Sequence, residues 1–182
     1  MKNYISSALR LTIVMLVIVL LYLGFVYIGS LFLPTHGKAE IINHKGQKLY
    51  TNIGQNFTSP RYFHGRPSAI DYNAAGSAGS NKGPSNEEYL STVQKRIDSL
   101  KIQNPEMKNT AVPVELVTAS GSGLDPDISE EGALYQVKRI AKERNLPENK
   151  IEALIREHTE NPLLGPSKVN VLKLNIALDN LK

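Results

Sequence analysis

Residues 11–33 read LTIVMLVIVLLYLGFVYIGSLFL, and this stretch decides how the rest of the chain is organised. No charged residue occurs between Arg10 and Lys38. A helix over this stretch, at about 1.5 Å per residue, is about 35 Å long and exceeds the roughly 30 Å hydrocarbon layer of a bilayer. The sequence therefore predicts a transmembrane helix over residues 11–33.

A cleaved signal peptide is the alternative interpretation of this stretch. Its apolar segment is typically about 7–15 residues long and ends at a small-x-small cleavage site. The run here is longer, and Leu31-Phe32-Leu33-Pro34 offers no such site, so we expect a retained anchor. Lys2 and Arg10 precede it with no acidic residue before Glu40, which favours a cytoplasmic N-terminus and an extracytoplasmic soluble domain.

Composition limits the remaining classes of protein. The 182 residues include 21 Lys and Arg, 17 Asp and Glu and no cysteine, for a net charge of +4. Zero cysteines exclude disulfide scaffolds, thiolate metal sites and cysteine nucleophiles, and so mild a charge does not indicate nucleic acid. We expect a cytoplasmic segment over 1–10, a connector over 34–53 and one soluble domain over 54–182.

Three helices are predicted in the soluble part. The first runs from Ser85 to about Lys101, with Ser85 and Glu88 at capping-box spacing. A buried stripe at three- and four-residue steps supports it, made of Tyr89, Val93, Ile97 and Leu100. Ser129 is expected to cap the second helix, which ends at residues 145–147.

The third helix and the strands complete the predicted fold class. The third helix presents Ile151, Leu154, Ile155 and His158 on one face, and Gly165-Pro166 is expected to end it. Residues 112–117 suit a strand or a helix start, residues 169–175 suit a strand, and the C-terminus is helix-like. The sequence thus predicts an α+β chain, with a single N-terminal transmembrane helix followed by one compact mixed α+β soluble domain.

A long segment without periodicity lies between the connector and the first soluble helix. From Gly65 to Pro84, 13 of 20 residues are Gly, Ser, Ala or Asn. Aromatic residues bracket this part, namely Phe57, Tyr62, Phe63 and Tyr72. Because a flexible linker would not carry them, we expect an ordered loop that packs against another surface.

Two loops are rich in glycine, residues 76–83 and residues 120–123. Neither satisfies a catalytic motif. A nucleophile elbow at Ser122 needs glycine at the positions of Ser120 and Leu124. A phosphate-binding P-loop needs glycine directly before Lys82. Either loop could still hold an anion with backbone N–H groups.

The polar side chains nominate no catalytic or metal site either. No local arrangement nominates a base among the four histidines, His36, His44, His64 and His158. The acidic pair Asp125 and Asp127 suits turn and capping chemistry better than cation binding.

Six strings of residues together resemble one family. They are residues 54–69 (GQNFTSPRYFHGRPSA), 79–84 (GSNKGP), 116–126 (LVTASGSGLDP), 135–136 (YQ), 158–160 (HTE) and 169–172 (VNVL). In this order they resemble the C subunit of the Kdp-type potassium-transporting ATPase. The resemblance implies a bacterial inner-membrane complex with three partners: a channel-like potassium-selecting subunit, a P-type ATPase subunit and a small single-span subunit.

The resemblance also implies a role. The C subunit is a non-catalytic accessory subunit of ATP-driven high-affinity potassium uptake, needed for assembly and described as a catalytic chaperone that raises ATP affinity. A nucleotide-binding set would then be Ser120, Gly121, Ser122, Gly123 and Gln136. We expect no tightly bound cofactor, with ATP acting through the ATPase subunit. Because ATP is cytoplasmic, an extracytoplasmic domain would act indirectly, whereas the inverted topology would allow direct contact.

Two further hypotheses concern contacts and class. Aromatic and arginine side chains are favoured interface anchors, so we expect Tyr62, Phe63, Arg66 and Tyr72 to contact the potassium-selecting subunit. A membrane-anchored extracytoplasmic binding protein or enzyme unrelated to ion transport is the alternative function.

Overall fold

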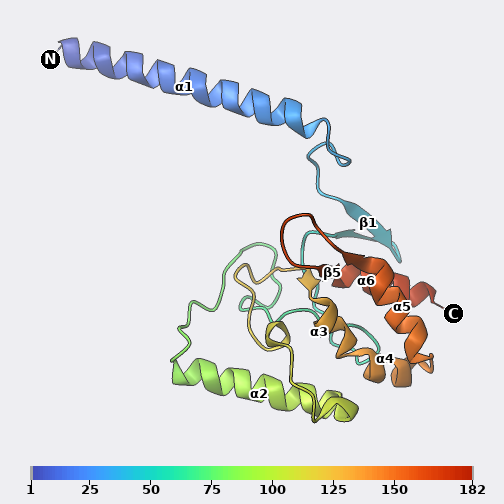
Figure 1. The fold of residues 1–182 in the computed structure, drawn as a ribbon. Coiled ribbons are helices and arrows are strands. Elements are labelled where there is room, and N and C mark those ends of the chain that lie inside the picture. The colour runs from blue at the N-terminus through green and yellow to red at the C-terminus, as the bar shows by residue number, and fades with distance from the viewer. Residues whose placement is uncertain (1, 182) are drawn as a thin grey trace. The chain divides into compact units, whose positions relative to one another are not determined.

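The structure is a computed structural model that describes the backbone of residues 2–181. It divides into two units, Met1–Glu40 and Ile41–Lys182. The first unit contains helix α1 (Lys2–Ser30), drawn in blue in Figure 1. Its stretch Tyr4–Ser30 is long and apolar enough to cross a membrane, and none of it is buried against protein.

Helix α1 starts earlier and ends earlier than the stretch predicted from the sequence. It includes residues 2–10, and it stops at Ser30 rather than at residue 33. The N–H groups of Leu31, Phe32 and Leu33 donate to carbonyls three residues back, at 3.1–3.2 Å, as in turns. Pro34 lies just beyond this turn, where it disfavours helical geometry at Leu33 and has no N–H to continue a helix.

The second unit is the soluble domain, which combines helices with two small antiparallel sheets. Its α-helices are α2 (Glu87–Gln103), α3 (Glu130–Leu134), α4 (Val137–Arg144), α5 (Glu148–His158) and α6 (Val171–Asn180), and its 3₁₀ turns are η1 (Pro105–Met107) and η2 (Val114–Leu116). Its strands are β1 (Ile41–His44), β2 (Gln47–Tyr50), β3 (Asp127–Ile128), β4 (Thr159–Glu160) and β5 (Lys168–Asn170). The predicted α+β class with a single N-terminal apolar helix is confirmed.

The two sheets differ in position and in burial. Strands β1 and β2 form a hairpin, with Ile41 opposite Tyr50. This hairpin lies in the segment expected to be a connector. Strand β5 is the centre of the other sheet, in the order β3-β5-β4, where Val169 faces both Ile128 and Thr159.

The core lies among α3, α4, α5 and α6 with β5 along one edge (Figure 1). Its fully buried side chains include Ile140, Ile151, Ile155, Val169, Leu174 and Leu178. The third predicted helix contributes its expected face, because Ile151, Leu154 and Ile155 are buried. That helix ends at His158, well before Gly165-Pro166, because the next two residues pair with β5 instead.

Two local predictions are wrong for an identifiable reason. Asn86, not Ser85, caps α2, since its side chain accepts a hydrogen bond from the Tyr89 N–H. The strand expected over residues 169–175 stops at Asn170, and helix α6 begins at the next residue. In both cases an asparagine side chain satisfies a free N–H of the first helical turn, here that of Lys173.

The second predicted helix is two helices. Ser129 caps α3 as expected, by accepting from the Gly132 N–H. The chain then breaks at Tyr135 and Gln136, and α4 ends at Arg144, followed by Asn145 in the left-handed conformation. Gln136, at this break, makes several hydrogen bonds within the domain.

Candidate functional site

The segment from residue 54 to residue 72 crosses the domain without helix or strand, yet buried side chains fix its backbone. The amide of Asn175 on α6 accepts from the Phe63 N–H at 2.8 Å and donates to the Phe63 carbonyl at 2.9 Å. The amide of Gln136 accepts from the His64 N–H at 2.8 Å and donates to the His64 carbonyl at 3.1 Å. The two amides thus replace the strand partner that an irregular backbone lacks.

Arg139 on α4 holds the preceding residues of the segment. Its guanidinium donates to the carbonyls of Pro60 and Tyr62, to Asn104 Oδ1 at 3.1 Å and to Gln136 Oε1 at 2.7 Å. Burial lowers the pKa of Arg139 to about 10, partly offset by Glu143. The guanidinium is therefore still protonated at neutral pH and is surrounded mainly by neutral oxygen atoms.

His64 follows Phe63 on the segment and lies beside this cation. Its side chain is largely enclosed and its Nε2 lies 3.0 Å from the Ser59 carbonyl. Burial, and secondly the positive charge of Arg139, lower the pKa of His64 below its ordinary value. The imidazole is thus neutral at pH 7, which suits a structural hydrogen bond more than proton transfer.

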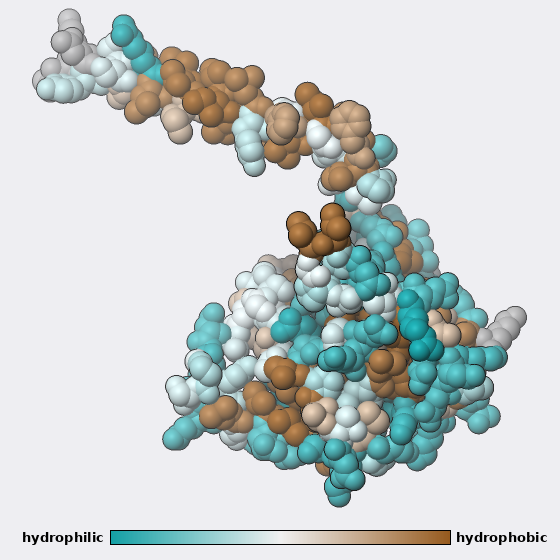
Figure 2. Space-filling view, viewed as in Figure 1, coloured by the Kyte–Doolittle hydropathy of each residue, from teal (hydrophilic) through white to brown (hydrophobic). Residues whose placement is uncertain are grey.

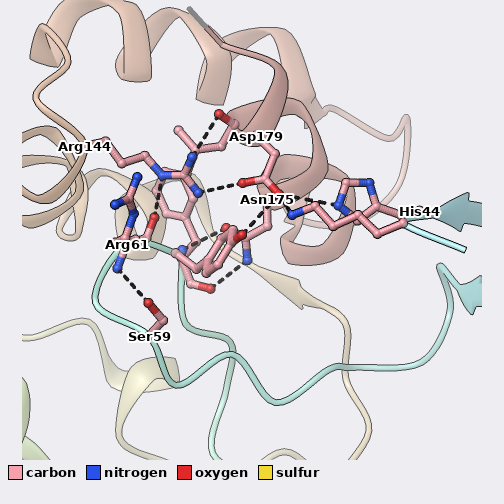
Figure 3. A network of polar contacts seen from close by, with 10 residues as sticks. His44, Ser59, Arg61, Arg144, Asn175 and Asp179 are labelled. Carbon is pink, nitrogen blue, oxygen red and sulfur yellow. Dashed lines mark hydrogen bonds and ion pairs between the residues drawn. The ribbon is translucent and has the colours of Figure 1, made fainter. Parts of the chain in front are cut away.

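A second polar network, centred on Asp179 of α6, fastens the hairpin to the helices (Figure 3). The Asp179 carboxylate accepts from Lys45 Nζ at 2.7 Å, Arg144 Nη2 at 2.8 Å and the Tyr62 hydroxyl at 3.1 Å. His44 Nε2 lies 3.4 Å from the same carboxylate. Lys45 and His44 are at the turn end of β1–β2, so this network joins the hairpin to α6.

Tyr62 links this network to the 54–72 segment. The guanidinium of Arg144 lies over its ring, 4.8 Å from the centroid, in a cation–π arrangement. The centroid of the Phe57 ring lies 5.6 Å from that of the Tyr62 ring, and the two planes are tilted relative to each other. A hollow of about 220 Å³ is lined by residues of the hairpin, by Phe57 and Tyr62 and by α6.

The Ser-Gly loop over residues 120–123 packs against the other glycine-rich loop. The Ser120 N–H donates to the Pro67 carbonyl at 3.1 Å, and the Ala78 N–H donates to the Ser122 carbonyl at 3.0 Å. At Gly123 the backbone φ is +69°, and a Cβ would lie 2.6 Å from the Ile70 side chain. This contact is the packing surface that the sequence predicted for the loop bracketed by aromatic residues.

The proposed nucleotide residues fall into two separate environments. Gln136 is 0% exposed and Ser120 is 2% exposed. Gln136 makes its hydrogen bonds to His64, Gly132 and Arg139, whereas the Ser-Gly loop bonds to residues 67–78. Binding of a nucleotide by Gln136 and the loop together would need these internal bonds to open.

The four proposed interface residues also differ in exposure. Phe63 is 0% exposed and belongs to the core, which weighs against it as a direct contact. Tyr62, Arg66 and Tyr72 are half-buried, and Arg66 forms an ion pair with Asp125 at 2.9 Å. The Tyr72 hydroxyl donates to the Arg66 carbonyl.

Both members of the acidic pair make bonds within the domain. Asp125 Oδ1 accepts from the Asp127 N–H at 3.1 Å, and Asp127 pairs with Lys168 at 2.8 Å. Among residues 2–181, no group of three or more His, Asp or Glu is placed to hold a metal ion.

Sequence reasoning missed the residues that hold the segment, namely Asn104, Arg139, Asn175 and Asp179. A signal was available, because Asn175 interrupts an otherwise apolar helical stripe. A polar residue on a buried stripe indicates a hydrogen-bond partner elsewhere in the chain.

Comparisons with known proteins agree over the whole chain. The family model described as "KdpC: K+-transporting ATPase, c chain" matches residues 5–180. A "Potassium-transporting ATPase KdpC subunit" from Flavobacterium johnsoniae is 59% identical over 150 residues, which cover 82% of each chain. Proteins with the same description occur in Flavobacterium psychrophilum, 52% identical over the full length of both chains, and in Bacteroides fragilis strain YCH46, 48% identical over 82% of this chain and 81% of the relative.

Proposed function

The chain belongs to the KdpC family of K+-transporting ATPase c chains, and we propose that its soluble domain is an assembly module that also supports ATP use by the ATPase subunit. Membership makes the chain a membrane subunit of a P-type potassium-transporting ATPase rather than a catalytic enzyme itself. The proposed partners are the potassium-selecting subunit, the ATPase subunit and the small single-span subunit. We place the soluble domain outside the cell, because the short N-terminus is basic.

One observation carries the assembly role: the 54–72 segment is irregular but rigidly held. Gln136 and Asn175 satisfy both backbone groups of His64 and Phe63. A loop whose conformation is fixed in advance loses little entropy when it binds a partner, which favours affinity. The half-buried Tyr62 and the exposed Arg61 offer an aromatic and a cationic contact on this segment.

The same geometry favours an indirect effect on ATP affinity. Direct contact through Gln136 would break its bonds to His64, Gly132 and Arg139 in a fully buried site. Breaking these bonds without replacement is costly, at about 1–3 kcal/mol for each buried group left unpaired. An effect through the partner subunits avoids this cost, and it requires a partner element with two states that the domain biases.

Assembly is tested with variants of the 54–72 segment in the intact complex. Arg61→Glu reverses an exposed charge, and Tyr62→Ala, Arg66→Ala and Tyr72→Ala combined remove the proposed anchors. We expect both to lower the yield of the purified complex. Lys95→Glu, an exposed charge reversal on α2, is the matched control and should not lower it. Normal complex yield from both segment variants would refute the proposed interface.

The melting temperature of each full-length chain in detergent separates loss of contact from loss of fold. Arg61→Glu should melt like the wild type, because its side chain is exposed. A normally folded Arg61→Glu chain that fails to assemble would identify a contact rather than a folding defect.

The effect on ATP is tested by comparing complexes that contain the full chain or the chain cut after residue 40, at equal amounts of purified ATPase subunit because the truncation is expected to lower the yield. We expect the KM for ATP to rise when the soluble domain is missing, with a smaller change in kcat. A photoreactive ATP analogue should label the ATPase subunit. Labelling of this chain within residues 120–136 would contradict the indirect mechanism.

Sidedness is tested with Ser77→Cys, since the chain has no cysteine of its own. Residue 77 is exposed, and a membrane-impermeant thiol reagent should label it in intact cells. A strain without the partner subunits and permeabilised cells control for a residue that is merely covered. Labelling only after permeabilisation would place the domain inside and favour direct nucleotide contact.

A further inference from the structure

The loop between β4 and β5, residues 161–167, carries the two most exposed large apolar side chains among residues 4–181. Leu163 is 100% exposed and Leu164 is 89% exposed. In Figure 2 a brown projection stands out from the mostly polar surface where Figure 1 draws this loop. Because exposed leucines are unfavourable in water, a fixed pair of them calls for an apolar partner.

The loop is built to hold these leucines outward. Its base is the antiparallel pairing of β4 with β5, with Glu160 opposite Lys168. Above the base, the Ser167 hydroxyl donates to Asn161 Oδ1 at 2.6 Å. Two prolines and Gly165, at a φ of +111°, fix the backbone of the tip. The leucines are therefore presented by a closed loop and not by a frayed segment.

The loop lies near the hairpin at which the chain enters the domain. Asn170, three residues after the loop, donates to the Thr51 carbonyl at 2.8 Å, and Thr51 directly follows the β1–β2 hairpin. The domain begins at Ile41, and only residues 31–40 separate it from the end of α1. Ten residues span at most about 35 Å when extended, so this connection sets an upper limit on the distance between the start of the hairpin and the end of α1.

We propose that Leu163 and Leu164 insert into the lipid surface of the membrane that α1 spans. Residues 161–167 carry no charge, so no ion has to lose its hydration. Burial of two leucines favours the bilayer by roughly 10²–10⁴-fold. This is weak for a free protein, but the anchor holds the loop at a high local concentration of lipid.

The composition of the loop favours lipid over a protein partner. Protein interfaces rely on aromatic and arginine side chains, and leucine is under-represented among their strongest contacts. Residues 161–167 contain no aromatic residue and no arginine. Lipid insertion would add a second attachment point beside the anchor and would restrict how the domain turns above the membrane.

The test uses the full chain reconstituted alone in vesicles of phosphatidylcholine and phosphatidylglycerol. Ser167→Cys gives a single site on the loop for an environment-sensitive fluorophore, and Lys95→Cys on α2 is the exposed control. The substitution removes the hydrogen bond to Asn161 but keeps the two prolines, Gly165 and the β4–β5 pairing that hold the leucines. Nitroxide-labelled acyl chains should quench the loop probe at least about twofold more than the control probe. Iodide in the aqueous phase should quench the control probe more than the loop probe.

A second variant removes the leucines and keeps the probe. Leu163→Ser with Leu164→Ser, in the Ser167→Cys background, should abolish lipid quenching and restore access to iodide. Its melting temperature should match that of the parent, because the exposed leucines contribute little to the core. This variant also shows whether the fluorophore itself drives insertion.

Two outcomes would overturn the proposal. One is equal access of iodide to the probes at residues 167 and 95 in vesicles. The other is protection of the loop probe only when the partner subunits are present, which would make the occupant a protein. The inference rests on the exposed loop and the anchor and not on the ATPase subunit, so it stands or fails independently of the effect on ATP.

Discussion

Replacement of Asp179 by asparagine tests whether the network on α6 fixes the hairpin that leads to the anchor. The carboxylate accepts hydrogen bonds from Lys45, Arg144 and Tyr62. Burial alone raises the pKa of Asp179, but these three hydrogen bonds and the charge of Lys45 outweigh it and hold the pKa well below its ordinary value. Asp179→Asn keeps the size of the side chain and removes its charge.

The expected loss of stability on Asp179→Asn follows from how exposed each partner is. Asp179 and Arg144 have side chains that are only 14% and 10% exposed, and breaking a buried pair costs about 3–5 kcal/mol. Arg144 keeps its bonds to the carbonyls of Arg61 and Leu178, which reduces the expected loss to about 2–3 kcal/mol. For a domain of this size, that lowers the melting temperature by about 6–12 °C.

The assay is thermal unfolding of the full chain in detergent, followed by tyrosine circular dichroism. Because the pKa of Asp179 is depressed in the folded state, its contribution is complete above the ordinary value of 3.8 and is lost as the pH falls through the folded-state value. The difference in melting temperature between the wild type and Asp179→Asn should therefore narrow below about pH 4. Lys45→Gln removes an exposed partner of the same carboxylate and should change little.

Two results would refute this reasoning. The first is a melting temperature for Asp179→Asn within about 1 °C of the wild type at pH 7. The second is a gap that stays constant as the pH is lowered, which would mean that the charge of the carboxylate is not the cause.

Three other predictions concern the 54–72 segment and the loop packed against it. Gly123→Ala should destabilise the domain by about 1–3 kcal/mol in urea unfolding, because at a φ of +69° its Cβ would lie 2.6 Å from the Ile70 side chain. Gly121→Ala is the control, since a Cβ there would meet nothing within 4 Å. Equal losses of stability in the two variants would contradict this. Gln136→Leu should cost about 2–5 kcal/mol by leaving both backbone groups of His64 unpaired, and amide hydrogen exchange at His64 should speed up, so unchanged protection there would exclude the proposed role. Since the pKa of His64 is lowered on folding, the unfolded chain binds the proton more readily, and stability should fall as the pH drops below about 6.5. His64→Gln should make stability depend less on pH in this range. An unchanged dependence of stability on pH would assign the effect to another group.

Local periodicity and hydrophobicity were sufficient for much of the chain. An uncharged apolar run predicts an anchor because no water is available to a charge inside a bilayer. The helix over residues 87–103 and the buried face containing Ile151 and Ile155 were predictable because a helix repeats every 3.6 residues. Of the stripe expected on the first of these helices, only Leu100 is buried, whereas Tyr89, Val93 and Ile97 are half-buried. The cap at Ser129 was predictable for the same local reason.

Where the local signal was ambiguous, neighbouring elements decided the structure. Residues 169–175 suit a strand and a helix equally well as an apolar run. Pairing of Val169 with Ile128 and Thr159 fixes a short strand, and the Asn170 cap starts α6 directly after it. Such a choice depends on residues that lie far apart in the sequence.

The apolar run, the helical periodicities and the long unusual strings of residues were enough to identify the anchor, the α+β class and the family. Which polar residues are already engaged inside the domain depended on the folded arrangement. Gln136 and Asn175 lie 72 and 112 positions from the backbone groups that they satisfy, and Phe63 is buried although its neighbours are not. The physical reason is that a hydrogen bond or a buried contact needs proximity in space, whereas a sequence pattern reports only the neighbours along one helix, strand or turn.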